Sequence, residues 1–254
     1  MHHTTRELRL ATALVEAADT LADDFEAPEH LRRVADQCVD LLAARAAGIM
    51  LVDGDRSVSL AGSSRQQEVA LDLLRTQHGG GPCVESYGSG LPVPPVSIRV
   101  AHAHARWPDF TAAALGHDIA STFAVPMRRG GTLFGALNVF APTLPDDSPS
   151  GSDSEVLLAQ VLADAAALGL HNRHQYTRYR TLSGQLQQAL ASRVRIEQAK
   201  GMLAERWGTA ADRAFLALRQ YARRRQLPLD EVARAVIAGL ADDAELRREA
   251  RETP

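Results

Sequence analysis

Residues 191–237 carry apolar side chains that repeat at helical spacing in three consecutive segments. Within each segment these side chains lie three or four residues apart, so they share one face of a helix. Three short amphipathic helices can close one small core that none of them buries alone. The predicted buried positions are Ile196, Ala199 and Leu203 in the first helix, Phe215, Leu218 and Ala222 in the second, and Leu229, Val232, Val236 and Leu240 in the third.

Local signals predict where these three helices begin and end. Gly208 predicts the end of the first helix. Thr209 offers an N-cap hydroxyl for the second helix, and Asp212, three residues later, completes a pair that resembles a capping box. Pro228 suits the first turn of the third helix, where its missing N–H removes no hydrogen bond.

The chain before this region alternates between helical and strand-like periods. Residues 1–26 predict an amphipathic helix, and residues 27–45 predict a second one whose inward positions are Leu31, Val34, Cys38, Leu41 and Leu42. The elements expected next are a strand at 47–52, a turn at 53–56, its hairpin partner at 57–62, a helix near 66–77 and a glycine-rich loop at 78–90. They are followed by an edge strand or loop at 92–98, a short helix within 105–120, hairpin strands at 121–127 and 132–142, and a surface loop at 144–152.

A long helix is expected to join the two regions. The chain has no proline from Ser152 to Trp207, and Ser152 with Glu155 forms a capping-box signal. Gly169 and Gly184 are the places where this helix would bend or break. An apolar stripe along its second half either packs within one chain or forms a parallel coiled coil between two chains. The stripe consists of Tyr176, Tyr179, Leu186, Leu190 and Val194.

Composition and charge separate the two regions further. The chain has 254 residues, 45% of them hydrophobic, which is enough for two domains with real cores. Its net charge is −3, but residues 173–225 hold 12 Lys and Arg against 3 Asp and Glu, and the remainder holds 16 against 28. An acidic body joined to a basic region indicates that only the basic region meets nucleic acid. No apolar run is long enough to span a membrane and no signal peptide is evident, so we expect a cytoplasmic protein.

The cations of the basic region allow two interpretations. Arg193 and Lys200 lie on a different stripe of the first helix from its apolar face, and Arg219 and Arg223 stand one turn apart on the second. Lys200 is the only lysine in the chain. These side chains form either a solvated helix face or a surface that binds phosphate groups.

A resemblance to a known family bears on this choice. It rests on Arg193, the run IEQAKG at 196–201, Leu203, Ala214, Phe215, Leu218, Arg219, Ala222 and the run VARAVI at 232–237. This array, over roughly residues 183–240, resembles the ANTAR family of transcription antitermination regulators. The resemblance implies that homodimers bind short paired stem-loops in nascent RNA. The residues expected to contact RNA are Arg193, Arg195, Gln198, Lys200, Arg206, Arg219, Arg223 and Arg224.

The N-terminal region carries a second resemblance. It rests on Gly81 with PC at 82–83, ARWPDF at 105–110, AVPM at 124–127 and GALNVFAP at 135–142. These residues resemble a GAF domain, over roughly residues 10–170. The resemblance implies an antiparallel sheet with helices on one side and a ligand pocket on the other. GAF domains sense many small molecules and some sense none, so the signal, a small molecule or a protein, stays open.

Other chemistry is weakly supported. The glycines at 79–81 could cradle a phosphate, but no Lys-Ser/Thr pair follows them to make a P-loop. The pairs His102 with His104 and His171 with His174 lack a neighbouring acid or cysteine, so we expect no metal site. Cys38 is most simply a buried apolar residue, and a redox role for Cys83 would need a resolving cysteine nearby. We therefore expect no catalytic residues and no cofactor.

Together these observations predict an α+β GAF domain, an antiparallel sheet with flanking helices, followed by a long helix and an all-α three-helix ANTAR-like domain. The expected divisions are a sensor domain at 1–170, a helical connector at 171–190, an RNA-binding domain at 191–240 and a charged C-terminal tail at 241–254. The expected function is a signal-responsive regulator that binds tandem RNA hairpins and prevents transcription termination. The alternatives are a ligand-binding GAF module whose helical tail dimerises, docks a protein or binds DNA, and a GAF-type enzyme.

Overall fold

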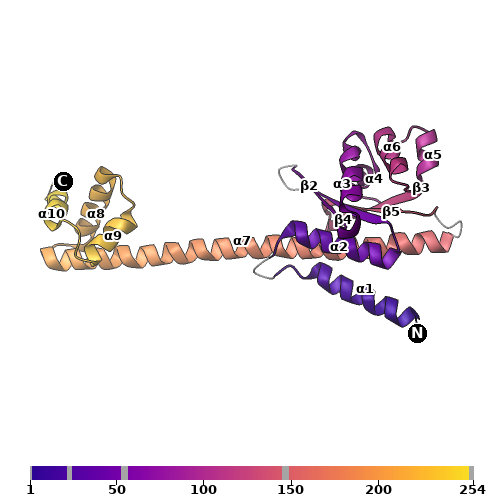
Figure 1. The fold of residues 1–254 in the computed structure, drawn as a ribbon. Coiled ribbons are helices and arrows are strands. Elements are labelled where there is room, and N and C mark those ends of the chain that lie inside the picture. Colours follow the sequence, from indigo (N-terminus) through magenta and orange to yellow (C-terminus); the bar gives the residue numbers. More distant parts are fainter. Residues whose placement is uncertain (1, 22–24, 53–56, 145–148, 252–254) are drawn as a thin grey trace. The chain divides into compact units, whose positions relative to one another are not determined.

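The computed structural model describes residues 2–21, 25–52, 57–144 and 149–251, and it divides into two compact units, Met1–Tyr176 and Thr177–Pro254 (Figure 1). The predicted turn at 53–56 lies outside the described residues. The first unit contains the helices α1 (His2–Ala18), α2 (Ala27–Leu42), α3 (Gln67–Arg75), α4 (Pro82–Ser89), α5 (Ile98–Ala103) and α6 (Pro108–Gly116), and the strands β1 (Ala46–Val52), β2 (Val58–Gly62), β3 (Val93–Ser97), β4 (Ser121–Arg129) and β5 (Thr132–Ala141).

The strands of the first unit form one antiparallel sheet with the order β2-β1-β5-β4-β3. The two predicted hairpins are confirmed: β1 pairs with β2, and β4 pairs with β5 through a turn at Gly130 and Gly131. Both glycines have positive φ, +53° and +83°, which favours glycine at these positions. Strand β3 lies at the edge of the sheet, where the prolines of the predicted segment 92–98 remove no central hydrogen bonds.

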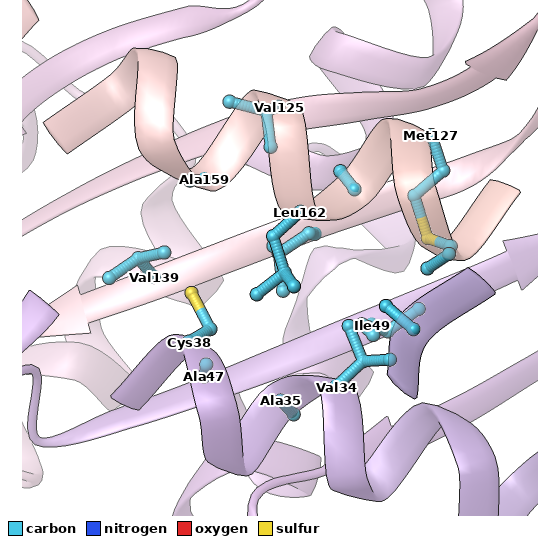
Figure 2. Packing of buried hydrophobic residues seen from close by; sticks show 14 of the residues in the cluster. Val34, Ala35, Cys38, Ala47, Ile49, Val125, Met127, Val139, Ala159 and Leu162 are labelled. Atoms are coloured by element: carbon cyan, nitrogen blue, oxygen red, sulfur yellow. The ribbon is translucent and has the colours of Figure 1, made fainter. Parts of the chain in front are cut away.

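One face of the sheet packs against helices α1, α2 and the first part of α7 (Pro149–Trp207) (Figures 1 and 2). Alternate residues of the strands, such as Ile49, Val125 and Leu137, point to this side, as the period of a strand requires. Cys38 of α2 and Leu162 of α7 meet them in the same cluster. The predicted inward face of α2 is therefore confirmed at its centre, and Cys38 is a buried packing residue.

Helices α3 to α6 cover the opposite face of the sheet (Figure 1). Here the other strand residues, including Phe140, pack with Phe110 of α6, whose ring centroid lies 6.3 Å from that of Phe140. Trp107 meets Phe110 edge to face at 6.1 Å. The expectation of helices on one side only is therefore wrong, because helices cover both faces of the sheet and the rings of Phe110 and Phe140 pack between α6 and the sheet.

Two predictions for the first unit are wrong. Residues 82–89 of the expected glycine-rich loop form helix α4, which begins with Pro82 and follows an extended Gly81. The Gln77 side chain accepts a hydrogen bond of 2.7 Å from the Cys83 N–H, so a residue outside the helix satisfies an N-terminal donor. The second error concerns the surface loop at 144–152 and the capping box at Ser152, because α7 begins at Pro149 and Ser152 lies inside its first turn. Residues 145–148 of that loop lie outside the described residues.

Helix α7 runs without a break for 59 residues. Neither Gly169 nor Gly184 interrupts it. Gly169 has a packing role: an added Cβ would lie 2.7 Å from the Ala17 carbonyl oxygen and 2.8 Å from a Thr20 methyl group. The Thr20 hydroxyl donates a hydrogen bond of 2.6 Å to the Gly169 carbonyl, so the end of α1 is fixed closely against α7.

The second unit contains the end of α7 with α8 (Ala211–Arg225), α9 (Leu229–Ile237) and α10 (Asp243–Arg251). Its core confirms the predicted inward face of the first ANTAR-like helix, and Leu218, Ala222, Val232 and Val236 are buried as predicted. Phe215 is half-buried, and Ala214 and Ala217 fill the core beside Leu218. Leu240 lies beyond the end of α9 and is 82% exposed, so its predicted burial is wrong.

The prediction that Thr209 is the N-cap of the second helix of this unit is wrong. Helix α7 ends at Trp207, and Gly208 follows with a φ of +63°. The Gly208 N–H bonds the Glu205 carbonyl and the Thr209 N–H bonds the Ala204 carbonyl, which is a Schellman motif. Thr209 therefore closes α7, while Ala210 is the N-cap of α8 without a side-chain bond.

Candidate nucleic-acid interface

The predicted contact residues divide between two helices of the second unit. Helix α7 carries five of them and α8 carries three. Arg193 and Lys200 are seven residues apart, so they lie within about 20° of each other around the axis of α7. Arg195 lies about 140° from Lys200, near the opposite side of the helix. One surface of α7 therefore cannot present all five residues.

Lys200 is a half-buried cation. Its side chain is 21% exposed, and its ammonium pairs with the Glu197 carboxylate one helical turn before it. Arg193 is exposed on the same side of α7. This side of α7 therefore presents two cations and the Glu197 carboxylate. An RNA phosphate could take the place of that carboxylate as the partner of Lys200.

Arg195 instead belongs to an ion pair between α7 and α9. Its guanidinium donates two hydrogen bonds to the Asp230 carboxylate, of 2.7 and 2.9 Å. Arg234 donates to the same carboxylate from the next turn of α9, at 2.7 Å. These bonds, from Arg195 first and then Arg234, lower the pKa of Asp230 to about 2. Arg195 thus joins two helices of the core.

Helix α10 engages another group of cations. Asp243 accepts hydrogen bonds of 3.1 Å from both Arg206 and the Trp207 indole. Glu245 accepts bonds from Arg224 at 3.2 Å and from Arg225 at 2.6 Å, and the bonds from Arg225 are the main reason that its pKa is lowered.

Helix α10 is part of the folded core rather than an appendage. Leu246 is fully buried in the same cluster as Leu203 and Leu218. Asp242 caps the helix, since its side chain accepts from the N–H groups of Ala244 and Glu245. This helix lies where a charged C-terminal tail was expected at 241–254, so that expectation is wrong for Asp243–Arg251. The Asp242 cap followed by one apolar residue four positions later is the signal that could have found it.

Three predicted cations remain available. Arg193, Arg219 and Arg223 are exposed, and within the described part of the chain no carboxylate pairs with them. Arg219 and Arg223 are one turn apart on α8, so they project from one side of it. Gln198 is exposed on α7. Free guanidinium groups at helical spacing suit a chain of phosphates.

The other chemical candidates, the histidine pair at 102 and 104 and the two cysteines, have structural contacts instead of converging on a site. His102 contacts the Thr111 hydroxyl at 3.1 Å and His104 contacts the Val100 carbonyl at 2.8 Å. Among the described residues, no group of three His, Cys, Asp or Glu side chains could hold a metal ion. Both cysteines are buried, and burial raises the pKa of Cys38 to about 12 and that of Cys83 further. Neither thiol has the thiolate character that redox chemistry needs.

Comparisons with known families agree with both units. The family model described as GAF domain matches residues 26–171, more than half of the 254 residues. The chain belongs to the GAF domain family. The model described as ANTAR domain matches residues 184–237, from the middle of α7 to the end of α9. ANTAR is an RNA-binding antitermination domain and GAF is a signal-sensing module, so the two matches support a regulator of this general kind.

Solved structures, two of them described as GAF domains, are similar to part of this chain. The GAF domain of A. aeolicus Nlh2 in an inactive state is 15% identical with a TM-score of 0.47, over 66% of this chain and 99% of that one. A GAF domain from an Acinetobacter phosphoenolpyruvate-protein phosphotransferase is 18% identical with a TM-score of 0.45, over 64% and 93%. The free methionine-R-sulfoxide reductase of Neisseria meningitidis is 18% identical with a TM-score of 0.44, over 66% and 91%. No curated protein matches the chain.

Both domains are sensory and regulatory in kind. The described helices include none that is long and apolar enough to cross a membrane.

Proposed function

We propose that this GAF–ANTAR protein is a signal-responsive regulator that binds stem-loops in nascent transcripts and prevents transcription termination. The observation that carries the proposal is the ANTAR match over residues 184–237, on a helical unit with free exposed cations. Such a regulator would act in the cytoplasm, where transcripts are made, and would need no catalytic residues.

The proposed RNA contacts are of two kinds. Arg193, Lys200, Arg219 and Arg223 supply phosphate contacts, since they are the cations that α9 and α10 leave available. Gln198 is an exposed amide on α7 that can bond a base edge in an unpaired loop. Arg195, Arg206 and Arg224 act indirectly, by holding α9 and α10 in place.

We further propose that the regulator works as a homodimer. The part of α7 within the second unit exposes Tyr179, Leu182, Leu186, Leu190 and Val194, several of them by more than half of their surface. At 100° per residue these five lie within a stripe about 120° wide, so a second α7 can cover them together. A coiled coil formed this way, including the connector at 171–190, would present two RNA-binding units at 191–240 to two hairpins.

Transcription from a template with a terminator tests the regulatory step. The template carries tandem hairpins, one of which overlaps the terminator, and the control template carries scrambled hairpins. The proposal predicts more read-through when the protein is added to the first template and none on the control. Equal read-through on both templates, or on neither, would contradict it.

A further inference from the structure

Helix α10 extends the second unit beyond the stretch that the ANTAR family model matches, which ends at residue 237. It packs beside α8 at the C-terminal end of the chain (Figure 1). Leu246 fixes it there, because this side chain is fully buried in the same cluster as Leu203 and Leu218. The effect of α10 on the cations beside it is therefore a property of the folded unit.

The charges of α10 are unevenly placed. The helix contains three acids and three arginines, so these side chains cancel in net charge. Two of the acids contact the rest of the unit: Asp243 accepts a hydrogen bond of 3.1 Å from Arg206, and the Glu245 side chain is only 17% exposed. Arg247 and Arg248 are exposed instead. The position of its acids, and not its net charge, thus determines how α10 acts on neighbouring cations.

Glu245 holds two of the three consecutive arginines at the end of α8. Its carboxylate accepts hydrogen bonds of 2.6 and 2.7 Å from Arg225 and one of 3.2 Å from Arg224. The two arginine side chains are still 50% and 51% exposed, so Glu245 occupies their N–H donors and offsets one charge without covering them. An RNA phosphate would use the same donors in the same way.

The third arginine of this run, Arg223, lies on a different side of α8. At 100° per residue, Arg223 is about 40° from Arg219 around the helix axis, whereas Arg224 is about 100° and Arg225 about 160° from Arg223. Arg219 and Arg223 are exposed, and no carboxylate in the described part of the chain pairs with them. Glu245 therefore engages the cations on one side of α8 and leaves those on the other side for RNA.

We propose that Glu245 determines the RNA specificity of the second unit, by confining the phosphate contacts of α8 to the side that carries Arg219 and Arg223. This inference rests on the proposed RNA-binding function and adds the means by which unrelated RNA is rejected. Every RNA has phosphates, so available cations on two sides of α8 would raise the affinity for any strand and carry no sequence information. A carboxylate that engages one side lowers this nonspecific binding and leaves the hairpin contacts in place.

Salt titrations of the full chain with two RNAs test the role of Glu245. The RNAs are a tandem-hairpin RNA and a scrambled RNA of the same composition. In Glu245→Gln, the scrambled RNA should bind about tenfold more tightly at low salt, with a salt dependence steeper by about one unit of slope, because the released guanidinium groups gain a phosphate contact. The tandem-hairpin RNA should gain less than about threefold, since its contacts lie on the other side of α8. A purely structural role of Glu245 would not steepen the salt dependence.

Two further variants serve as controls. Glu205→Gln removes the same charge from an exposed acid of α7 in the same unit, and it should leave the salt dependence unchanged. Arg225→Gln should also leave the binding of both RNAs unchanged, because Glu245 already holds that cation. This second variant tests the proposal even if circular dichroism shows that Glu245→Gln does not fold.

The proposal is overturned if Glu245→Gln does not tighten the binding of the scrambled RNA, if both RNAs gain equally, or if Glu205→Gln has the same effect. It is also overturned if Arg225→Gln flattens the salt dependence by about one unit of slope, since Arg225 would then contact phosphate beside Glu245. Equal binding of the two RNAs by the unchanged protein would contradict the proposed function instead. The comparison of salt slopes among the variants would still decide the role of Glu245.

Discussion

At the scale of residues, the hydrogen-bond or ion-pair partner of each cation determines whether that cation is available to contact RNA. Arg195 and Lys200 are five positions apart on one helix, yet Arg195 is held by a carboxylate of α9 and Lys200 only by its neighbour Glu197. The partners of Arg195 and Arg206 lie 35 and 37 positions away in the chain. The spacing of residues along one helix could not reveal these partners on other helices. The sequence therefore predicted one set of RNA-contacting cations, whereas the structure has two sets, one held by carboxylates of α9 and α10 and one not.

Lys200 is the cation that tests the RNA face most directly. Lys200→Ala should weaken RNA binding by roughly 1–2 kcal/mol and flatten the salt dependence by about one unit of slope, because one phosphate contact is lost. Arg206→Ala is the matched comparison: it should lower the melting temperature through its lost bond to Asp243 and leave the salt slope unchanged. A salt titration of RNA binding checks both. An unchanged slope in Lys200→Ala would remove Lys200 from the interface.

Asp230 gives the second unit a predictable response to acid. Its folded pKa of about 2 lies below the value of about 3.9 expected when unfolded. The contribution of its ion pairs is therefore complete above about pH 4 and is lost as the pH falls toward about 2. Asp230→Asn should destabilise the unit by roughly 1–2 kcal/mol at neutral pH and weaken this acid dependence.

Calorimetric melting of the full chain between about pH 5 and pH 2 measures this response. The transition that Asp230→Asn lowers at neutral pH identifies the second unit. Asp212→Asn, an exposed position on α8, is the control and should keep the acid dependence of the unchanged protein. Parallel pH profiles for all three proteins would refute the role given to Asp230.

At the scale of elements, periodicity predicted most of the fold, and specific contacts between elements explain the rest. Apolar spacing placed α2, both hairpins and the inward face of α7 correctly. It failed at α4, where Gln77 caps a helix that glycine and proline seemed to exclude. The N-cap predicted at Thr209 is also wrong, because the Thr209 N–H completes the Schellman motif at the end of α7. At both positions a particular hydrogen bond, which apolar spacing does not encode, sets the end of a helix.

Apolar periodicity also failed to predict helix α10, and the contribution of this helix to the core of the second unit can be tested. Leu246 is fully buried, whereas Leu240, a few residues earlier, is 82% exposed. Leu246→Ala should destabilise the second unit by roughly 2–4 kcal/mol, because it removes buried apolar surface and leaves a cavity. Leu240→Ala should change stability by less than about 0.5 kcal/mol. Urea unfolding monitored by circular dichroism checks the pair, and equal effects would mean that α10 does not close the core.

At the scale of the whole molecule, the proposed homodimer links the stripe on α7 to paired hairpins. Leu186 and Leu190 are 57% and 63% exposed, and no described residue of the chain covers them. Replacing both with aspartate should dissociate the dimer. It should also weaken binding to tandem hairpins more than binding to one hairpin, because linked sites gain from effective concentration. Light scattering that finds the unchanged protein monomeric with and without RNA would exclude this assembly.

The charge of the chain is also partitioned at this scale. Residues 173–225 are strongly basic and the rest of the chain is acidic. The acids of α10 lie against part of the basic region, where they pair with Arg206 and Arg225. The proposed RNA contacts are therefore the cations of this region that α10 leaves exposed.

A binding titration with three nucleic acids tests the central claim most directly. The ligands are a tandem-hairpin RNA, a scrambled RNA of the same composition and a duplex DNA of matched sequence. The proteins are the full chain and fragments of residues 1–176 and 177–254, which follow the two compact units. We predict that, of the three nucleic acids, the tandem-hairpin RNA binds most tightly to the full chain or to the fragment 177–254. The fragment 1–176 should bind no RNA. Tighter binding to the duplex DNA, or RNA binding by the fragment 1–176 alone, would contradict it.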